Sequence, residues 1–240
     1  MRALGASHPS LPLTVIVNPN SGPRGVDSDD PMLTCLPALR KSLPRAKIVG
    51  YVSTAYGARD AAAVESDVGV YKSWAAQGGL GSGTASVKLD GIFFDELNPD
   101  ATNATNIALY RSYASGVRSQ FGTASWVVLN PGDPAPTAFY SMADIIVSYE
   151  SAYKSFKATS VKKNTSTGQP ASKQAIMAYS VPKASLNAFV KAVAPTYGWL
   201  FATDLNIAKT DVYGKLPTFW STEVADLVKV DKVKRNVAKR

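Results

Sequence analysis

Seven short apolar segments rich in β-branched residues recur along the chain, and within each the apolar residues are continuous rather than alternating with polar ones. Continuous apolar segments of this length are typical of strands buried on both faces, as in a parallel sheet flanked by helices. The predicted strands are Leu13 to Val17, Lys47 to Val52, Leu89 to Phe94, Ser125 to Leu129, Asp144 to Tyr149, Gln174 to Tyr179 and Gly198 to Ala202.

Helical patterns lie between these segments, for example at Asp60 to Ala76, Ala101 to Phe121 and Lys183 to Ala194. Strand and helix alternate with a repeat of roughly 31 residues, which is the repeat of a barrel of about 250 residues built from eight β/α units. We therefore expect an α/β fold of the TIM-like (β/α)8 barrel type. A doubly wound open sheet is the alternative architecture.

Only seven units are visible, so either the sheet closes without the first strand of such a barrel or the chain is a truncated form. The segment from Met1 to Ala6 resembles the end of a helix that leads into the strand at Leu13. The chain has 240 residues, of which 45% are hydrophobic, and this is enough for one sizeable core. We expect residues 1–240 to form a single domain.

The formal net charge of +8 is concentrated in a C-terminal tail, where residues 229–240 hold six basic residues against one acid, Asp231. A basic run at a terminus is typical of a solvated helix end or a disordered end. No recognisable nucleic-acid-binding module accompanies it, so we expect no nucleic-acid partner.

Few kinds of catalytic chemistry are open to this chain, because it has one cysteine, Cys35, and one histidine, His8. A disulfide framework is excluded, and serine, cysteine and zinc catalysis through histidine would depend on a single histidine, which the chain can supply at most once. Carboxylates are the acid and base groups that are left. We expect neither a metal nor a cofactor.

No apolar run approaches the roughly 18 residues needed to span a bilayer, and the first residues lack the apolar core of a leader. The sequence therefore predicts no membrane span, and as a separate expectation we take the protein to be a monomer. A glycine-rich segment from Gly78 to Gly83 follows a predicted helix and precedes a strand, which is the wrong context for a dinucleotide site and indicates a loop.

Polar residues follow the predicted strands, at the end that forms the catalytic face of an α/β barrel. The most informative is the pair Asp95 and Glu96, because two adjacent carboxylates end an apolar strand, and Glu150 ends another. The full set at or just past strand ends is Asn18, Ser53, Asp95, Glu96, Asn130, Glu150, Ser180 and Asp204.

Carboxylates gathered at one rim suit glycoside hydrolysis, in which one acid attacks or stabilises the anomeric carbon and another protonates the departing oxygen. The competing interpretation is that Asp95 and Glu96 cap the following helix or pair with lysine or arginine. Aromatic rings near the strand ends could pack against sugar faces, although most rings in a barrel belong to the core. They are Tyr51, Tyr56, Tyr149, Tyr179 and Trp220.

Five blocks in the same order resemble the spherulin-4 family: Val15 to Pro23, Gly50 to Gly57, Gly91 to Glu96, Val127 to Gly132, and Ala143 to Glu150. Its characterised members belong to glycoside hydrolase family 135, which are fungal (β/α)8 barrels that cleave α-1,4-linked N-acetylgalactosamine in galactosaminogalactan. The resemblance implies a polysaccharide substrate, secretion or a cell-surface location, and an acidic cluster of Asp95, Glu96 and Glu150. It places Asn18, Tyr51, Tyr56 and Asn130 near the cleft, to which we add Tyr179 and Asp204 as substrate contacts.

This chain departs from the family at its start, where an additional strand with a Pro-Leu-Tyr type motif and an export signal are absent. Two sequons, beginning at Asn103 and Asn164, fit a secretory route. By architectural analogy Asp95 is the expected nucleophile and Glu150 the acid/base, with Glu96 assisting, and the roles of Glu96 and Glu150 are open to exchange.

Two other functions compete with hydrolysis. A non-catalytic cell-surface carbohydrate-binding or structural protein would bind sugar without releasing product. A polyanion-binding protein that uses the basic tail would lose affinity steeply with added salt.

Overall fold

The computed structural model describes residues 12–25, 30–77, 87–100, 103–156 and 169–237, with the side chains of 231–237 excepted. The chain divides into two compact units. Unit 1 comprises Met1–Asn130 and Ser141–Asp144, and unit 2 comprises Pro131–Tyr140 and Ile145–Arg240.

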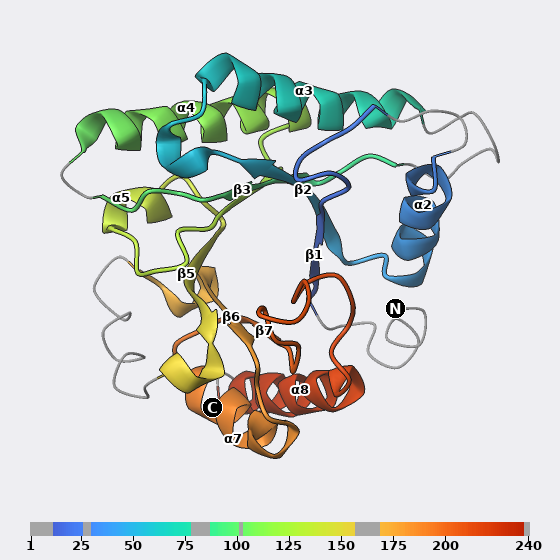
Figure 1. The fold of residues 1–240 in the computed structure, drawn as a ribbon, viewed down its shortest axis with the longest axis vertical. Coiled ribbons are helices and arrows are strands. Elements are labelled where there is room, and N and C mark those ends of the chain that lie inside the picture. The colour runs from blue at the N-terminus through green and yellow to red at the C-terminus, as the bar shows by residue number, and fades with distance from the viewer. Residues whose placement is uncertain (1–11, 26–29, 78–86, 101–102, 157–168, 238–240) are drawn as a thin grey trace. The chain divides into compact units, whose positions relative to one another are not determined.

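Unit 1 is built on four parallel strands that pair in chain order (Figure 1). They are β1 (Thr14–Val17), β2 (Lys47–Ser53), β3 (Gly91–Asp95) and β4 (Trp126–Leu129). The register places Ser53 beside Asp95 at the ends of β2 and β3. The order contains no reversal, so this unit lacks the switch point of a doubly wound sheet.

Helices α2 (Met32–Ser42), α3 (Ala61–Gln77) and α4 (Ala104–Phe121) connect these strands, and α3 and α4 lie side by side along β2 and β3 (Figure 1). Gly50 in β2 makes the close packing of α3 possible, because a Cβ at this position would lie 2.6 Å from the Tyr71 ring. The Tyr71 hydroxyl then donates to the Val17 carbonyl at 3.0 Å. The apolar stripe of α3 is thereby fixed against the strands.

Unit 2 holds three further parallel strands, β5 (Ile145–Ala152), β6 (Gln174–Tyr179) and β7 (Trp199–Ala202), again in chain order. The register of β5 against β6 shifts between Val147 and Tyr149, which leaves Ser148 as a bulge. As a result Glu150 pairs with Met177, and β5 continues to Ala152. The sequence predicts Glu150 at or just past the end of this strand, whereas in the structure it lies within β5.

The helices of unit 2 are α5 (Thr137–Tyr140), α7 (Leu186–Val193) and α8 (Trp220–Val237), and α7 and α8 pack on each other. Short 3-10 turns occur at Tyr153–Ser155, Ala171–Lys173 and Lys183–Ser185. The core gathers Ile176 of β6, Phe189 and Val190 of α7, and Phe219. Residues 229–237 of the basic tail form the last part of α8.

All seven predicted strands and the three predicted helices are confirmed, with small differences at their ends. Helix α4 begins at Ala104 rather than Ala101, because the Asn103 side chain caps it by accepting from the Asn106 amide at 2.9 Å. Helix α2 is not predicted by the sequence pattern, since Pro37 lies inside it. His8, Met1 to Ala6, the glycine-rich segment and the sequon at Asn164 lie outside the described residues.

No helix in the described part of the chain is long and apolar enough to cross a membrane.

Candidate active site

The Asp95 carboxylate at the end of β3 is held from both sides by the neighbouring strands of unit 1. The Tyr51 hydroxyl of β2 donates to Asp95 Oδ2 at 2.7 Å, and the Asn130 side-chain amide, just past β4, donates to Oδ1 at 2.7 Å. Parallel strands bring their C-terminal ends to one edge, so three residues distant in sequence meet there. Both oxygens of Asp95 thus receive a neutral donor, which fixes the plane of the carboxylate.

Glu96 leaves β3 in a left-handed conformation, with a φ of 58°. This backbone state is uncommon outside glycine and costs about 1 kcal/mol. It turns the Glu96 side chain to Ser53 of β2, whose hydroxyl donates to Glu96 Oε2 at 2.5 Å. We refer to Tyr51, Ser53, Asp95, Glu96 and Asn130 as the Asp95 cluster.

Thr54 stabilises the unusual turn between Asp95 and Glu96. Its buried hydroxyl lies 2.8 Å from the Asp95 carbonyl oxygen and 2.9 Å from that of Glu96, and it donates to them. The Tyr110 hydroxyl lies 2.7 Å from the Thr54 hydroxyl oxygen, and because the single Thr54 proton is directed at the two carbonyl groups, Tyr110 is the donor of this bond. Burial raises the pKa of the Tyr110 phenol, against the opposing effect of its bond to Thr54, so this donor keeps its proton.

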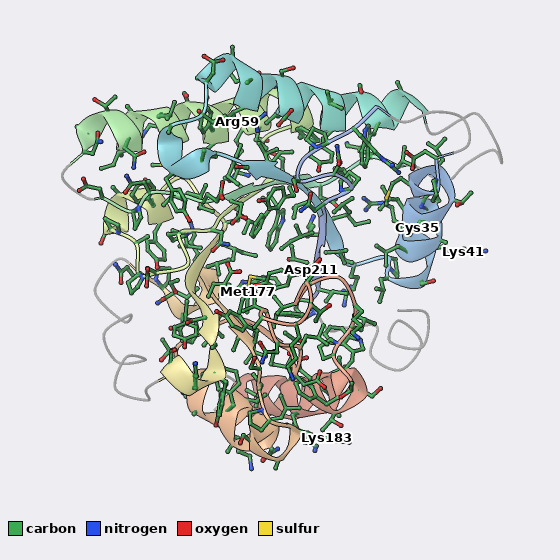
Figure 2. The ribbon with its side chains drawn as sticks, in the orientation of Figure 1. Cys35, Lys41, Arg59, Met177, Lys183 and Asp211 are labelled. Atoms are coloured by element: carbon green, nitrogen blue, oxygen red, sulfur yellow. The ribbon has the colours of Figure 1, made fainter. Side chains whose placement is uncertain are left out.

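Neither acid of the Asp95 cluster forms an ion pair within the described residues, and neither caps α4, whose cap is Asn103. The nearby Arg59, labelled in Figure 2, instead donates to the Ser53 carbonyl at 3.0 Å and pairs with Asp67 at 2.6 Å. Within the described residues, Asp95 and Glu96 therefore act neither as the cap of α4 nor as members of an ion pair. Their partners are a hydroxyl, a phenol and an amide, which are groups suited to binding and catalysis.

Two predicted substrate contacts of unit 1 lie in turns after their strands. Tyr56 follows β2 in a short turn where Ala55, Tyr56 and Gly57 all have positive φ, and its side chain is 62% exposed. Asn18 follows β1, and its Oδ1 accepts from the Gly22 amide at 2.9 Å. Tyr56 is thus exposed to solvent, whereas the Asn18 side chain already accepts one hydrogen bond within the turn that follows β1.

In unit 2 Glu150 receives a hydrogen bond from the Tyr213 hydroxyl, which comes from the segment between β7 and α8. The Glu150 amide also donates to the Gly132 carbonyl at 2.8 Å. Gly132 has a φ of 69°, and a Cβ added to it would lie 3.7 Å from the Glu150 Cβ. Glu150 and Tyr213 are called the Glu150 pair.

The remaining predicted contacts of unit 2 are Tyr179, the half-buried last residue of β6, and Asp204, which follows β7. Both oxygens of Asp204 accept from Thr218, at 3.0 Å from the amide and 2.5 Å from the hydroxyl. Although burial alone would raise the pKa of Asp204, these bonds and Lys215 lower it. Asp204 therefore stabilises the contact with Thr218, and its contact with substrate stays a prediction.

Sequence reasoning missed Thr54, Tyr110 and Tyr213 as supporting residues. Thr54 directly follows the Ser53 that ends β2, so its polarity at a strand end was the available signal. Helical periodicity places Tyr110 on the apolar face of α4 but does not indicate its contact with Thr54, and Tyr213 lies in a loop without a periodic signal.

The family comparison decides the relationship, since the model of spherulation-specific family 4 matches residues 2–227 of the chain. The chain belongs to this family. Within spherulation-specific family 4, the curated Spherulin-4 of Physarum polycephalum is 27% identical over 228 residues, or 92% of this chain. The chain spans 63% of the length of that relative.

A solved structure is also similar to this member of spherulation-specific family 4. The crystal structure of Aspergillus clavatus Sph3 in complex with GalNAc matches with a TM-score of 0.81 and 29% identity, covering 93% of this chain and 88% of Sph3. Together with the parallel strands in chain order, this match confirms the expected fold class, an α/β fold of the TIM-like barrel type, of which the described residues form seven strands.

Proposed function

We propose that this protein is a glycoside hydrolase that cleaves an α-linked, galactosamine-containing polysaccharide of the galactosaminogalactan type. Membership in spherulation-specific family 4 and the similarity to Sph3, which binds GalNAc, support the substrate class. The observation that carries the proposal is the Asp95 cluster, in which Tyr51 and Asn130 each donate at 2.7 Å to one oxygen of Asp95.

In the proposed reaction Asp95 attacks the anomeric carbon while the protonated carboxyl of Glu150 donates its proton to the departing glycosidic oxygen. A glycosyl ester on Asp95 results, and water deprotonated by Glu150 then releases the sugar. The donors from Tyr51 and Asn130 suit Asp95 for this role because they preset the carboxylate plane before the substrate arrives. Glu96, held by Ser53, would accept a sugar hydroxyl beside the reacting bond.

The other proposed contacts would bind the polysaccharide outside the bond that breaks. Tyr56 is exposed and its phenol combines an apolar face with a hydrogen-bonding tip, which is the property expected of a sugar-stacking ring. Asn18, Tyr179 and Asp204 are proposed as polar contacts. We further propose a monomeric, secreted or cell-surface protein that needs no cofactor.

Replacing the two principal acids tests the proposal directly. In purified protein we expect Asp95→Asn and Glu150→Gln each to lower the release of reducing ends from galactosaminogalactan by about 10³-fold or more, because a catalytic carboxylate supplies several kcal/mol of transition-state stabilisation. Glu65→Gln, which changes an exposed acid of α3, is the matched control and should keep wild-type activity.

The same assay separates hydrolysis from the competing functions. Full activity in either acid variant would remove that residue from the mechanism. Tight binding of the polysaccharide by the wild type without product would favour the non-catalytic carbohydrate-binding protein. Binding that survives loss of the acids and falls steeply with salt would favour a polyanion partner.

A further inference from the structure

The segment that carries Tyr213 is residues 203–219, which we call the 203–219 loop. It joins β7 to α8 and is fastened at its base, where both oxygens of Asp204 accept hydrogen bonds from Thr218. These two bonds bring the ends of the loop together. The 203–219 loop is thus closed on itself rather than a free connection.

Near its middle the loop is shaped by Asp211, which is labelled in Figure 2. The Asp211 side chain accepts from the Tyr213 amide at 2.8 Å, which is the pattern of an Asx turn. Val212 between them is buried, with 2% of its surface exposed. A side-chain turn and a buried anchor therefore fix the backbone on which Tyr213 stands.

Tyr213 spans one row of side chains on the strands of unit 2. The register places Glu150 of β5 opposite Met177 of β6, and Met177 opposite Phe201 of β7. The Tyr213 ring lies 5.9 Å from the Phe201 ring, centroid to centroid, while its hydroxyl donates to Glu150 Oε1. The phenol thus rests on β7 and reaches across to the carboxylate on β5.

We propose that Tyr213 is a positioning residue for Glu150, an inference that rests on the proposed function of Glu150 as acid/base. Glu150 is only partly buried, and a glutamate side chain has three rotatable bonds, so its carboxylate needs an external contact to hold one orientation. Tyr213 supplies this contact from a rigid aromatic ring on an anchored loop. Misplacing a proton donor by about 1 Å can cost a hundredfold in rate.

Kinetics of Tyr213→Phe give the first test, because this change removes only the hydroxyl and keeps the ring on Phe201. We expect kcat for the polysaccharide to fall about tenfold to a hundredfold while KM stays within about twofold, since the phenol orients Glu150 rather than binding substrate. Ile207→Ala is the control on the same loop, where the side chain is 61% exposed, and it should leave both constants unchanged. An unchanged kcat, or a change in KM alone, would overturn the proposal.

A second measurement does not depend on activity. The carboxyl carbon of Glu150 can be followed by 13C NMR in selectively labelled protein and assigned by its loss in Glu150→Gln. We expect its chemical shift at fixed pH to change in Tyr213→Phe and not in Ile207→Ala. If the wild type releases no product, the proposed function fails, and the NMR signal still tests the contact between Tyr213 and Glu150. A changed chemical shift in Tyr213→Phe supports this contact, and an unchanged one contradicts it.

Asp211 provides a variant that leaves the phenol intact. Asp211→Ala removes the turn acceptor and should lower kcat in the same direction as Tyr213→Phe, whereas Asp211→Asn keeps an acceptor and should retain most of the rate. Thermal unfolding of each variant, compared with wild type, shows that the protein is folded. Equal rates for the alanine and asparagine variants would show that the turn does not position Tyr213.

Discussion

At the scale of single residues, one hydroxyl group holds the turn on which both acids of the Asp95 cluster depend. Thr54 donates to the carbonyl groups of Asp95 and Glu96 and receives a hydrogen bond from Tyr110. All of this takes place at a threonine that is 1% exposed. Water cannot replace the hydroxyl there, so the network offsets the strain of the left-handed Glu96.

We expect Thr54→Val, which keeps the shape and removes the hydroxyl, to lower the free energy of unfolding by about 2–4 kcal/mol. The reason is that the Tyr110 hydroxyl loses its partner in Thr54, and the carbonyl groups of Asp95 and Glu96 each lose one donor while keeping the backbone amides of Thr54 and Tyr56. Urea unfolding measures the change. Thr54→Ser retains the hydroxyl and should cost clearly less, and equal losses for the two variants would show that packing of the methyl group is what matters.

The residue scale also separates what a sequence can predict at a site from what it cannot. Asp95, Tyr51 and Asn130 belong to strands or their immediate ends, so a strand pattern is enough to place them on one edge. Tyr213 belongs to a loop, and the sequence gives no rule for where a loop side chain points. Its contact with Glu150 depends on the turn at Asp211 and the buried Val212.

At the scale of elements, the start of β3 depends on the absence of a side chain at Gly91. A Cβ at this position would lie 1.9 Å from the Trp126 carbonyl oxygen of β4, a separation that no real structure tolerates. Backbone of a neighbouring strand cannot yield as a flexible side chain can. The strand that carries Asp95 therefore requires glycine at its first residue.

We expect Gly91→Ala to destabilise unit 1 by several kcal/mol or to prevent its folding, because the clash forces β3 away from β4. Gly69→Ala in α3 is the matched comparison: nothing lies within 4 Å of a Cβ there, and alanine should add about 0.5–1 kcal/mol through its helix preference. Circular dichroism during thermal unfolding checks both. A Gly91→Ala protein as stable as wild type would contradict the register of β3 and β4.

The bulge in β5 shows how an element can differ from its sequence pattern. The apolar run predicts a strand that ends before Glu150, because the pattern becomes polar there. In the structure Ser148 has no paired residue on β6, and its buried hydroxyl donates a hydrogen bond to the Gln174 side-chain oxygen at 2.9 Å. A shift of one residue exchanges the two faces of a strand, so this bulge determines which face carries Glu150.

At the scale of the whole molecule, one buried acid outside the proposed site links stability to pH. Glu223 of α8 is fully buried, and its Oε1 accepts from the Ala202 amide at 2.7 Å. Its Oε2 has no partner among the described residues. Burial raises the pKa of Glu223 from the usual 4.5 to about 8, against the smaller effect of the bond from Ala202.

The folded chain therefore holds a proton on Glu223 between about pH 4.5 and pH 8, where the unfolded chain has released it. Stability must fall as the pH rises through this range, since the folded state binds more protons. We expect the free energy of unfolding to decrease by up to a few kcal/mol between pH 5 and pH 8 on account of this group.

Glu223→Gln isolates this contribution, because glutamine keeps an acceptor for the Ala202 amide and does not titrate. The difference in unfolding free energy between wild type and variant should shrink or reverse as the pH rises, as measured by urea unfolding at several pH values. A difference that stays constant from pH 5 to pH 8 would mean that Glu223 is not protonated in the folded state.

The sequence by itself determined the strand order, the fold class and the position of Asp95 and Glu96 at the end of a strand. These are local properties, because apolar side chains recur along the chain wherever a strand or a helix face is buried. Tertiary structure alone decided the partners of those acids: Tyr51 and Asn130 on Asp95, Ser53 on Glu96, and Tyr213 on Glu150. Such contacts depend on register, on a bulge and on loop turns that bring distant residues within hydrogen-bonding distance, and no local pattern encodes these.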